Sequence, residues 1–248
     1  MHRFYLPPTE CKTGSLTLTG REAHHATRVL RLRRGDDVVV LDGAGGELNC
    51  VVQESGRDLV QLTVLKKNLV PAPAHQITLL QAIPKGKIIE SILQKAVELG
   101  VHRIVPLLTE RVATRLDGAD AAHKAEKFRQ VAIEAIKQCG SAWLPRIETP
   151  MSPREFLARD EKFELSLIAS LQPGAQPARE YFQRFQNEHG RKPANVCVWV
   201  GPEGDFTAAE VQAAQAGGAL PITLGRLVLR VETATTYCLS ILNHELHS

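Results

Sequence analysis

The segment 70–74 limits the fold more than any other feature of the sequence, because the residue pattern changes there. It reads Val-Pro-Ala-Pro-Ala, and each proline fixes the backbone and lacks the amide donor that a helix or strand needs. Residues 36–70 before it predict a small antiparallel barrel or sandwich. After residue 75, apolar runs alternate with helical patterns. The sequence therefore predicts two domains, residues 1–70 and 75–248.

The first predicted domain contains short runs of branched apolar residues that are separated by turn signals. Asp42-Gly43, followed by Gly45 and Gly46, is typical of a tight turn, because aspartate and glycine tolerate turn conformations. Short apolar runs at this close spacing are typical of antiparallel strands. The predicted strands are residues 38–41, 48–52 and 59–65.

The second predicted domain alternates strands and helices. Its strands are apolar throughout, which indicates that helices cover both faces of a parallel sheet. Ligands of such sheets bind beyond the carboxyl ends of the strands. The predicted strands are residues 77–83, 104–108, 165–169, 196–200 and 222–224, and the clearest helices are residues 88–97 and 119–138.

The composition is that of an ordinary globular protein. Hydrophobic residues make up 44% and charged residues 23% of the 248, which excludes a disordered or fibrous chain. No apolar run approaches the roughly 18 residues of a membrane span, and no apolar signal segment follows Met1, so we expect a cytoplasmic protein. The five scattered cysteines and the unclustered histidines predict neither disulfides nor a metal site.

Positive charge is concentrated near the N-terminus. Residues 1–34 hold seven arginines and lysines but only two glutamates, whereas the whole chain has a net charge of +3. A surface that contacts RNA phosphates gives this pattern, and so does a solvent-exposed helix face around residues 28–34. Both interpretations stay open. The excess of arginine over lysine favours RNA, because planar guanidinium donors suit phosphates and base edges.

Two predicted strand ends carry unusual loops. Residues 201–206 read Gly-Pro-Glu-Gly-Asp-Phe, and Thr207 with Glu210 forms a capping box that starts the next helix. The glycines let a ligand approach the backbone, yet the loop has none of the motifs of a phosphate-binding loop. Residues 224–234 form the second loop, an apolar turn that runs into a helix. Each loop alone is an ordinary connection between a strand and a helix.

Together, the motifs resemble one known family. GPEGDF at 201–206, LGRLVLRVETA at 224–234 and KGKIIESILQKAVELGVHRIVP at 85–106 are similar to the bacterial 16S ribosomal RNA uridine-N3 methyltransferases of the SPOUT superfamily. RFYLP at 3–7 and HHATRVLRLRRGD at 24–36 fit the RNA-binding barrel of that family. The resemblance covers nearly the whole chain. It implies a PUA-like N-terminal β-barrel and an α/β SPOUT domain with a parallel sheet and a trefoil knot.

The resemblance also implies a cofactor, a substrate and a partner. S-adenosylmethionine is the implied methyl donor, and 16S ribosomal RNA or the small ribosomal subunit is the implied substrate. The chain is expected to form a homodimer, without a metal or a membrane. Carried over residue by residue, the cofactor-binding residues are Ser170, Leu171, Gly201, Pro202, Glu203, Gly204, Leu224, Gly225, Arg226, Leu229 and Arg230.

Methylation of uracil N3 requires that its proton leaves and that the negative charge on O2 and O4 is stabilised. Arg230 is the candidate residue for stabilising this negative charge, because its guanidinium stays protonated and donates directed hydrogen bonds. Glu232 is the candidate base or the group that orients the base. It could instead cap its helix or pair with Arg230, and water or hydroxide could take the proton.

The implied RNA contacts are Arg3, Arg28, Arg31, Lys85, Lys95 and Arg111.

Three positions depart from the pattern of the family. Lys137 and Ser141 stand where an acidic and a basic residue are usual. Asp205 replaces a glycine, which strains the loop if this position needs a positive φ, although aspartate tolerates that conformation better than most residues. The cofactor loops are otherwise complete, so the prediction of an enzyme stands.

Other interpretations fit parts of the same sequence. A SPOUT enzyme that methylates a ribose 2′-hydroxyl would use the same cofactor loops, although the N-terminal barrel argues against it. A non-catalytic ribosomal RNA-binding protein would keep the fold without the activity. Lys95 is better explained by an exposed pair with Glu98 than by an RNA contact. The apolar stripe on the last helix fits either a homodimer contact or the core, and it consists of Ala234, Tyr237, Cys238, Ile241 and Leu242.

Overall fold

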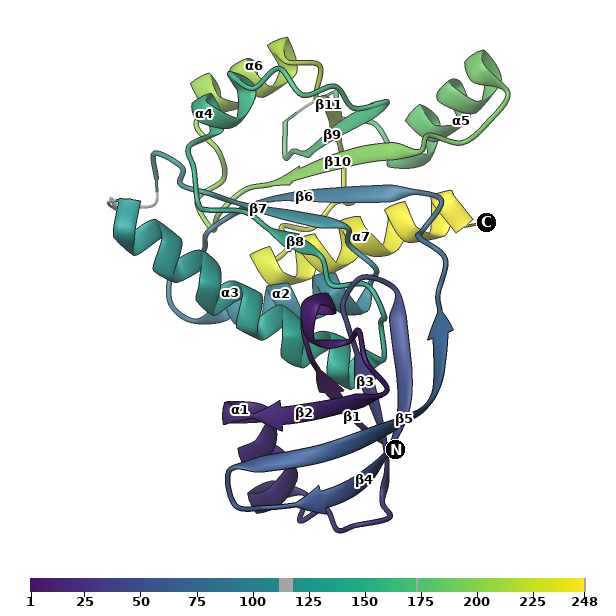
Figure 1. Ribbon diagram of the computed structural model, residues 1–248. Coiled ribbons are helices and arrows are strands. Elements are labelled where there is room, and N and C mark those ends of the chain that lie inside the picture. Colours follow the sequence, from purple (N-terminus) through teal and green to yellow (C-terminus); the bar gives the residue numbers. More distant parts are fainter. Residues whose placement is uncertain (112–117, 173, 248) are drawn as a thin grey trace. The chain divides into compact units, whose positions relative to one another are not determined.

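The chain folds into two compact units, whose elements are labelled in Figure 1. The computed structural model describes residues 1–111, 118–172 and 174–247. Unit 1 comprises Met1–Ala72 and Ile133–Leu144, and unit 2 comprises Pro73–Ala132 and Pro145–Ser248. The predicted division into residues 1–70 and 75–248 stays a prediction. It does not include the segment Ile133–Leu144, which returns to unit 1.

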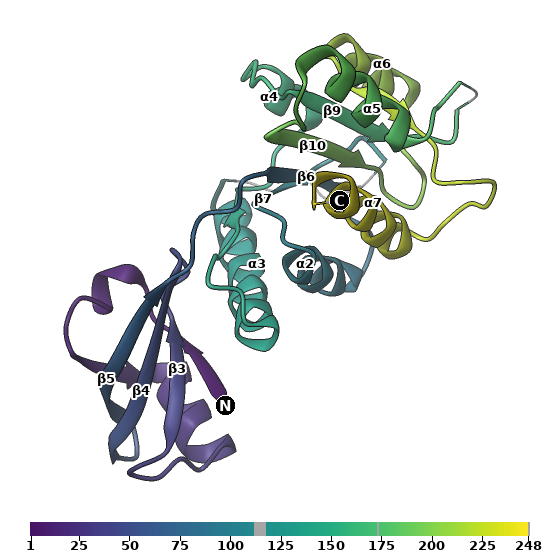
Figure 2. The same ribbon diagram turned by 90° about the vertical axis from the view of Figure 1, so that its right-hand side faces the viewer.

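Unit 1 is built on a five-stranded sheet with the order β1-β3-β4-β5-β2. Its neighbouring strands are antiparallel, except β1 and β3, which run parallel. The sheet curls, as Figure 2 shows, and fits the expected PUA-like barrel. The three predicted strands are confirmed, whereas β1 and β2 lie outside the branched runs and are not predicted. The strands are β1 His2–Tyr5, β2 Ser15–Thr19, β3 Asp37–Leu41, β4 Gly46–Ser55 and β5 Leu59–Leu69.

Short helical turns complete the N-terminal part of unit 1. The π-helical turn η2 ends at Val29, and Arg31 has a φ of +55°. The alternative of a solvent-exposed helix face over residues 28–34 is therefore wrong, because most of these basic residues follow the helix on irregular backbone. The turns are η1 Pro8–Glu10, α1 Gly20–His24 and η2 His25–Val29.

The returning segment of unit 1 is held by hydrogen bonds and ion pairs. Lys137 is 7% exposed, and its Nζ lies 2.8 Å from Glu22 Oε1 and 2.9 Å from Glu134 Oε1. Arg3 donates to the carbonyl of Gln138 at 3.2 Å. A buried lysine needs such partners, because an unpaired charge would be costly to desolvate. The departure at Lys137 is therefore matched by carboxylates within the same unit.

Unit 2 contains a six-stranded sheet with the order β11-β9-β10-β6-β7-β8. All neighbouring strands are parallel, which confirms the predicted sheet. Strand β11 starts at Leu220 and not at Ile222, because Pro221 is tolerated on an edge strand, where one side needs no amide donor. The strands are β6 Gln76–Ala82, β7 Arg103–Leu107, β8 Arg146–Ile147, β9 Leu165–Ala169, β10 Asn195–Val200 and β11 Leu220–Ile222.

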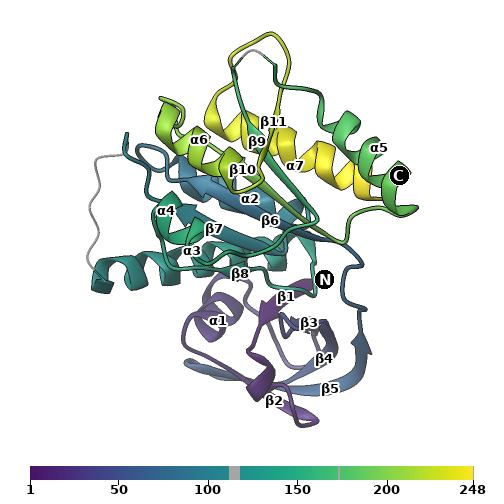
Figure 3. The ribbon, with the colours of Figure 1, turned by 90° about the horizontal axis from the view of Figure 1, so that it is seen from above.

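Helices cover both faces of this sheet. In β10, Val196 and Val198 pack with α2, α5 and α7, whereas Cys197 and Trp199 pack with α4 and α6. Figure 2 shows α4 and α6 above the sheet and α2 and α7 below it, and Figure 3 shows α5 beside the C-terminal part of α7. The alternation explains why the strands read as apolar throughout. None of the described helices is long and apolar enough to cross a membrane. The helices are α2 Ile88–Glu98, α3 Gly118–Cys139, α4 Pro153–Leu157, α5 Ala178–His189, α6 Ala208–Ala216 and α7 Val231–His247.

The apolar stripe on α7 faces the core of unit 2 for most of its length. Cys238 and Leu242 are buried, and Ala234 and Ile241 pack against the same cluster, whereas Tyr237 is 47% exposed. Burial raises the pKa of the Cys238 thiol to about 12, so this thiol stays protonated near neutral pH. The core interpretation therefore accounts for the stripe, except for Tyr237.

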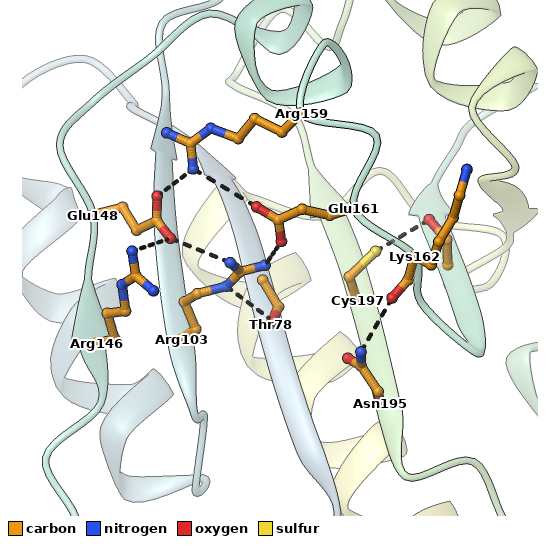
Figure 4. Close-up of polar contacts among 10 residues, drawn as sticks. Thr78, Arg103, Arg146, Glu148, Arg159, Glu161, Lys162, Asn195 and Cys197 are labelled. Atoms are coloured by element: carbon orange, nitrogen blue, oxygen red, sulfur yellow. Dashed lines mark hydrogen bonds and ion pairs between the residues drawn. The ribbon is translucent and has the colours of Figure 1, made fainter.

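An ion-pair network joins β7 to the segments on either side of α4 (Figure 4). The carboxylate of Glu148, which is 4% exposed, lies 3.2 Å from Arg103, 2.6 Å from Arg159 and 3.5 Å from Arg146. Arg103 also contacts Glu161 at 2.5 Å. Several cations around one buried carboxylate offset its desolvation. The network fixes the chain between β8 and β9, and so helps to place β9 in the sheet.

We expect Glu161→Gln to remove part of the acid sensitivity of this network. Arg103 donates to the Glu161 carboxylate and holds its pKa below the ordinary 4.5. A depressed pKa stabilises the folded state at higher pH, and this stabilisation is lost as the pH falls through the folded pKa. Urea unfolding should therefore show a steeper fall in the free energy of unfolding below about pH 4.5 for the wild type than for the variant.

Glu188→Gln serves as the control for this measurement. Glu188 is exposed on α5 and makes no ion pair within the described residues. Its variant should follow the wild-type pH profile. Parallel profiles for the wild type and Glu161→Gln would contradict the assignment.

Candidate cofactor pocket and active site

Three loops emerge from one edge of the sheet in unit 2. Strand β9 lies between β10 and β11, and all three run parallel, so their carboxyl ends lie together. The amide of Ser170, just after β9, donates to the carbonyl of Ile222 at the end of β11, at 3.0 Å. This bond continues the ladder beyond the strands. The motif loops after β10 and β11 are thereby brought beside the loop after β9.

The three loops enclose a cavity of about 470 Å³. All the predicted cofactor-binding residues line it except Gly204 and Arg226, and both candidate catalytic residues line it as well. Helix α2 contributes Ile88, which belongs to the 85–106 motif but is not among the predicted cofactor-binding residues. The lining residues outside the predicted cofactor-binding and catalytic sets are Ile88, Ala169, Val200, Asp205, Leu227, Val228, Val231 and Ala234.

The loop after β10 turns so tightly that it requires a glycine at its start. A Cβ on Gly201 would lie 2.9 Å from Asp205 Oδ1 and 3.2 Å from the amide nitrogen of Phe206. Asp205 has a φ of +60°, so this position does adopt the conformation for which glycine is usual. Its side chain accepts from the Phe206 amide at 2.8 Å. This local bond offsets part of the strain and keeps the loop closed.

Neighbouring loops hold the loop after β10 in place. Glu203 Oε1 accepts from the backbone amide of Lys85 at 3.0 Å, and Arg111 donates to the carbonyl of Gly204. Both partners follow strands β6 and β7, which are the next strands along the sheet. The capping box of Thr207 and Glu210 forms as predicted at the start of α6. The cofactor loop is therefore fixed from both ends.

Arg230 and Glu232 lie where the third loop enters α7. Arg230 precedes the helix and is exposed, whereas Glu232 is half-buried in the first turn. Neither makes an ion pair within the described residues, so the alternative of an Arg230–Glu232 pair is wrong for this structure. A carboxylate in the first turn of a helix is favoured by the positive end of the helix dipole. Both charged groups remain available to a ligand in the cavity.

The candidate RNA contacts differ in their surroundings. Arg28 and Arg31 are exposed on unit 1, and Arg3 is engaged there by backbone carbonyls. Lys95 lies 2.9 Å from Glu98, as the exposed-pair alternative predicts. No group of three histidine, cysteine or acidic side chains gathers for a metal ion in the described part of the chain. The RNA-binding role of these residues stays a prediction.

Comparison with known proteins agrees with this arrangement. Residues 71–243 match the RNA methyltransferase domain family, and residues 18–65 match the RNA methyltransferase PUA domain family. Ribosomal RNA small subunit methyltransferase E of Synechocystis sp. is 32% identical over 100% of this chain and 78% of the relative. The protein of that name in Bacillus subtilis is 28% identical over 99% of this chain and 97% of the relative.

Two solved structures are similar over nearly the whole chain. A putative methyltransferase from Legionella pneumophila in complex with S-adenosylmethionine has 31% identity and a TM-score of 0.87, covering 98% of this chain and 96% of that one. Ribosomal RNA small subunit methyltransferase E from Neisseria gonorrhoeae, bound to S-adenosylmethionine, has 27% identity and a TM-score of 0.84, covering 98% and 97%. An RNA methyltransferase domain and a PUA domain are thus combined in one chain. This chain belongs to the RNA methyltransferase family that includes ribosomal RNA small subunit methyltransferase E.

Two substitutions of Glu203 separate its charge from its contact with Lys85. Glu203→Ala removes the acceptor of the Lys85 amide, whereas Glu203→Gln keeps an acceptor oxygen. Because a hydrogen bond to a charged group contributes about 1.5–3 kcal/mol, we expect the alanine variant to bind S-adenosylmethionine roughly tenfold more weakly. The glutamine variant should stay close to the wild type. Isothermal titration measures both affinities, and equal losses in the two variants would contradict a positioning role.

Proposed function

We propose that the protein methylates N3 of a uridine in 16S ribosomal RNA, with S-adenosylmethionine as the donor. The observation that supports this most is the convergence of the two motif loops and the loop after β9 on one cavity. Two similar solved proteins bind S-adenosylmethionine, and relatives found by sequence are named for small-subunit ribosomal RNA. An enzyme that acts on ribosomal subunits works in the cytoplasm.

The residues of the cavity fit S-adenosylmethionine. Adenine is a flat, neutral ring that binds to backbone groups between apolar walls, and Gly201 leaves the backbone open while Leu171 and Leu224 supply walls. The carboxylate of Glu232 suits a positively charged sulfonium. When bound, S-adenosylmethionine supplies an electrophilic methyl group.

Arg230 and Glu232 have different roles in the reaction of the uracil. The Arg230 guanidinium donates to O2 or O4 and stabilises the negative charge that develops as N3 loses its proton. Glu232 accepts that proton or orients a water that does so. Neither side chain is committed to an ion pair within the described residues, so both can turn toward a base in the cavity. Holding N3 in line with the methyl group supplies most of the remaining rate enhancement.

The RNA must present an unpaired base to this cavity. The Watson–Crick edge of uracil carries N3, so the base has to leave its stack and its pair before reaction. This requirement favours a loop or a single-stranded segment of the small subunit. The exposed arginines of unit 1, such as Arg28 and Arg31, would hold the flanking phosphates.

We also propose that two copies of the chain associate through the rim of the cavity. Leu171, Leu227 and Val228 are 61%, 77% and 79% exposed at this rim, and large apolar side chains so exposed favour a protein contact. Tyr237, the exposed member of the α7 stripe, adds to the apolar surface of unit 2. Light scattering should give twice the chain mass of 27.3 kDa, and the mass of a single chain would contradict the proposal.

Nucleoside mass spectrometry of the RNA product tests the function directly. Small subunits that lack the modification are incubated with the purified protein and S-adenosylmethionine, and the RNA is then digested to nucleosides. We expect 3-methyluridine. A 2′-O-methylated nucleoside would assign the other SPOUT reaction, and donor binding without any methylated product would favour a non-catalytic RNA-binding protein.

Arg230→Ala should reduce turnover far more than donor affinity. The Arg230 guanidinium is a hydrogen-bond donor aimed at developing charge, and such a group acts mainly in the transition state. Its loss is therefore expected to lower kcat by about 100-fold. Arg230→Lys keeps the charge without the forked geometry and should fall between the wild type and the alanine variant. Initial rates and isothermal titration separate the two effects. Equal losses in turnover and donor affinity would make Arg230 a cofactor ligand only.

A further inference from the structure

A second hollow lies within unit 1, and none of its residues lines the cofactor cavity. It is a shallow, open depression of about 490 Å³ between the η2 turn and the tight turn that joins β4 to β5. Its lining residues are Thr27, Arg28, Ser55, Gly56 and Arg57. Arg28 is an expected RNA contact, whereas the sequence predicts no role for the β4–β5 turn.

The two walls of this hollow are each fixed by a local hydrogen bond. Thr27 Oγ1 donates to the carbonyl of Ala23 at 2.9 Å, which anchors the η2 wall. The amide of Gly56 donates to the carbonyl of Leu59 at 3.0 Å, which closes the β4–β5 turn. The two basic side chains therefore project from backbone that is already ordered, and such preorganisation favours binding.

The chemistry of the hollow is that of an anion site. Arg28 and Arg57 are both exposed, and neither makes an ion pair with a carboxylate in the described ranges. Glu54 and Asp58 flank the turn, but they do not line the hollow. The Ser55 hydroxyl adds a neutral donor. Two forked guanidinium groups beside a hydroxyl suit the several oxygens of one phosphate better than a single carboxylate.

We propose that one backbone phosphate of the RNA substrate binds between Arg28 and Arg57, with Ser55 as a third donor. The proposal rests on the proposed function, because it takes the ligand to be RNA. Residues from two elements far apart in the sequence, the η2 turn and the β4–β5 turn, would contact this phosphate. The contact would fix the RNA backbone on unit 1. Contacts of this kind set the register of the RNA without reading its sequence.

The salt dependence of RNA binding tests the proposal. A fluorescein-labelled single-stranded oligoribonucleotide of mixed sequence is titrated at several salt concentrations with the full chain and with Arg28→Gln, Arg57→Gln and the double variant. Each neutralised phosphate contributes about 0.7 to the slope of log K against log salt for single strands. If both arginines hold one phosphate, each single variant should keep most of the slope, because one guanidinium remains. The double variant should lose about 0.7.

Other outcomes overturn the proposal. A loss of about 0.7 in each single variant and about 1.4 in the double variant would mean two separate phosphates. Unchanged slopes in all three variants would mean an exposed surface without a phosphate. Arg57→Lys keeps a charge in the hollow and should retain the wild-type slope, and Arg179→Gln on the exposed face of α5 controls for net charge. Thermal unfolding checks that each variant is folded.

The same preparations separate this proposal from the proposed function. If the wild type methylates small subunits but the double variant keeps its salt slope, only the phosphate site is wrong. If the wild type yields no 3-methyluridine, the proposed function is wrong, whatever the slopes show.

Discussion

The parallel pairing of β9 with β10 and β11 is the constraint on which the candidate active site depends. Backbone hydrogen bonds set the register of these strands, and the register sets where each chain leaves the sheet. The Ser170 amide bonds to Ile222 beyond the last paired residues, so the loops start side by side. A shift of one residue would also turn every side chain of the shifted strand to the opposite face. The alternating burial of β10 opposes such a shift, because both of its faces are packed.

The cofactor loop combines strain with restraint. Asp205 occupies a conformation for which glycine is usual, and its own carboxylate accepts from the next amide. Glu203 and Arg111 then bind this loop to the loops after β6 and β7. Contacts from several strands position a loop better than its own turn could alone. The arrangement explains how an open, glycine-containing loop can keep a defined shape around a ligand.

Much of the fold was predictable because its signals are local. The apolar runs, the helical spacing of residues 88–97 and the capping box at Thr207 each depend on residues that are close in sequence. The sequence predicts β11 two residues too late, because Pro221 argues against a strand unless the strand is known to lie at an edge. The sequence does not predict strand β2, because the strand has only two buried apolar residues, Leu16 and Leu18. It also lies outside the runs of branched apolar residues. The family resemblance supplied the pairing of the two motif loops, which periodicity alone does not reveal.

Contacts between distant residues were not predictable in the same way. Ile88 lines the cavity, and Glu203 bonds to Lys85, although 118 residues separate that pair. Lys137 is paired with Glu22, which lies 115 residues away in the sequence. The sequence shows that Lys137 departs from the family pattern, but it does not show that Glu22 is its partner. The hollow between Arg28 and Arg57 likewise joins two turns that no motif links. Such contacts depend on the assembled sheets and become visible only when the strands are in register.

Diffraction from crystals of this protein grown with S-adenosylmethionine tests the central claim most directly. We expect ordered density for S-adenosylmethionine between the loop that starts at Gly201 and the loop that starts at Leu224, with the methyl group of the cofactor facing Arg230. A donor bound elsewhere on the chain, or loops that close on each other and leave no room for it, would contradict the account.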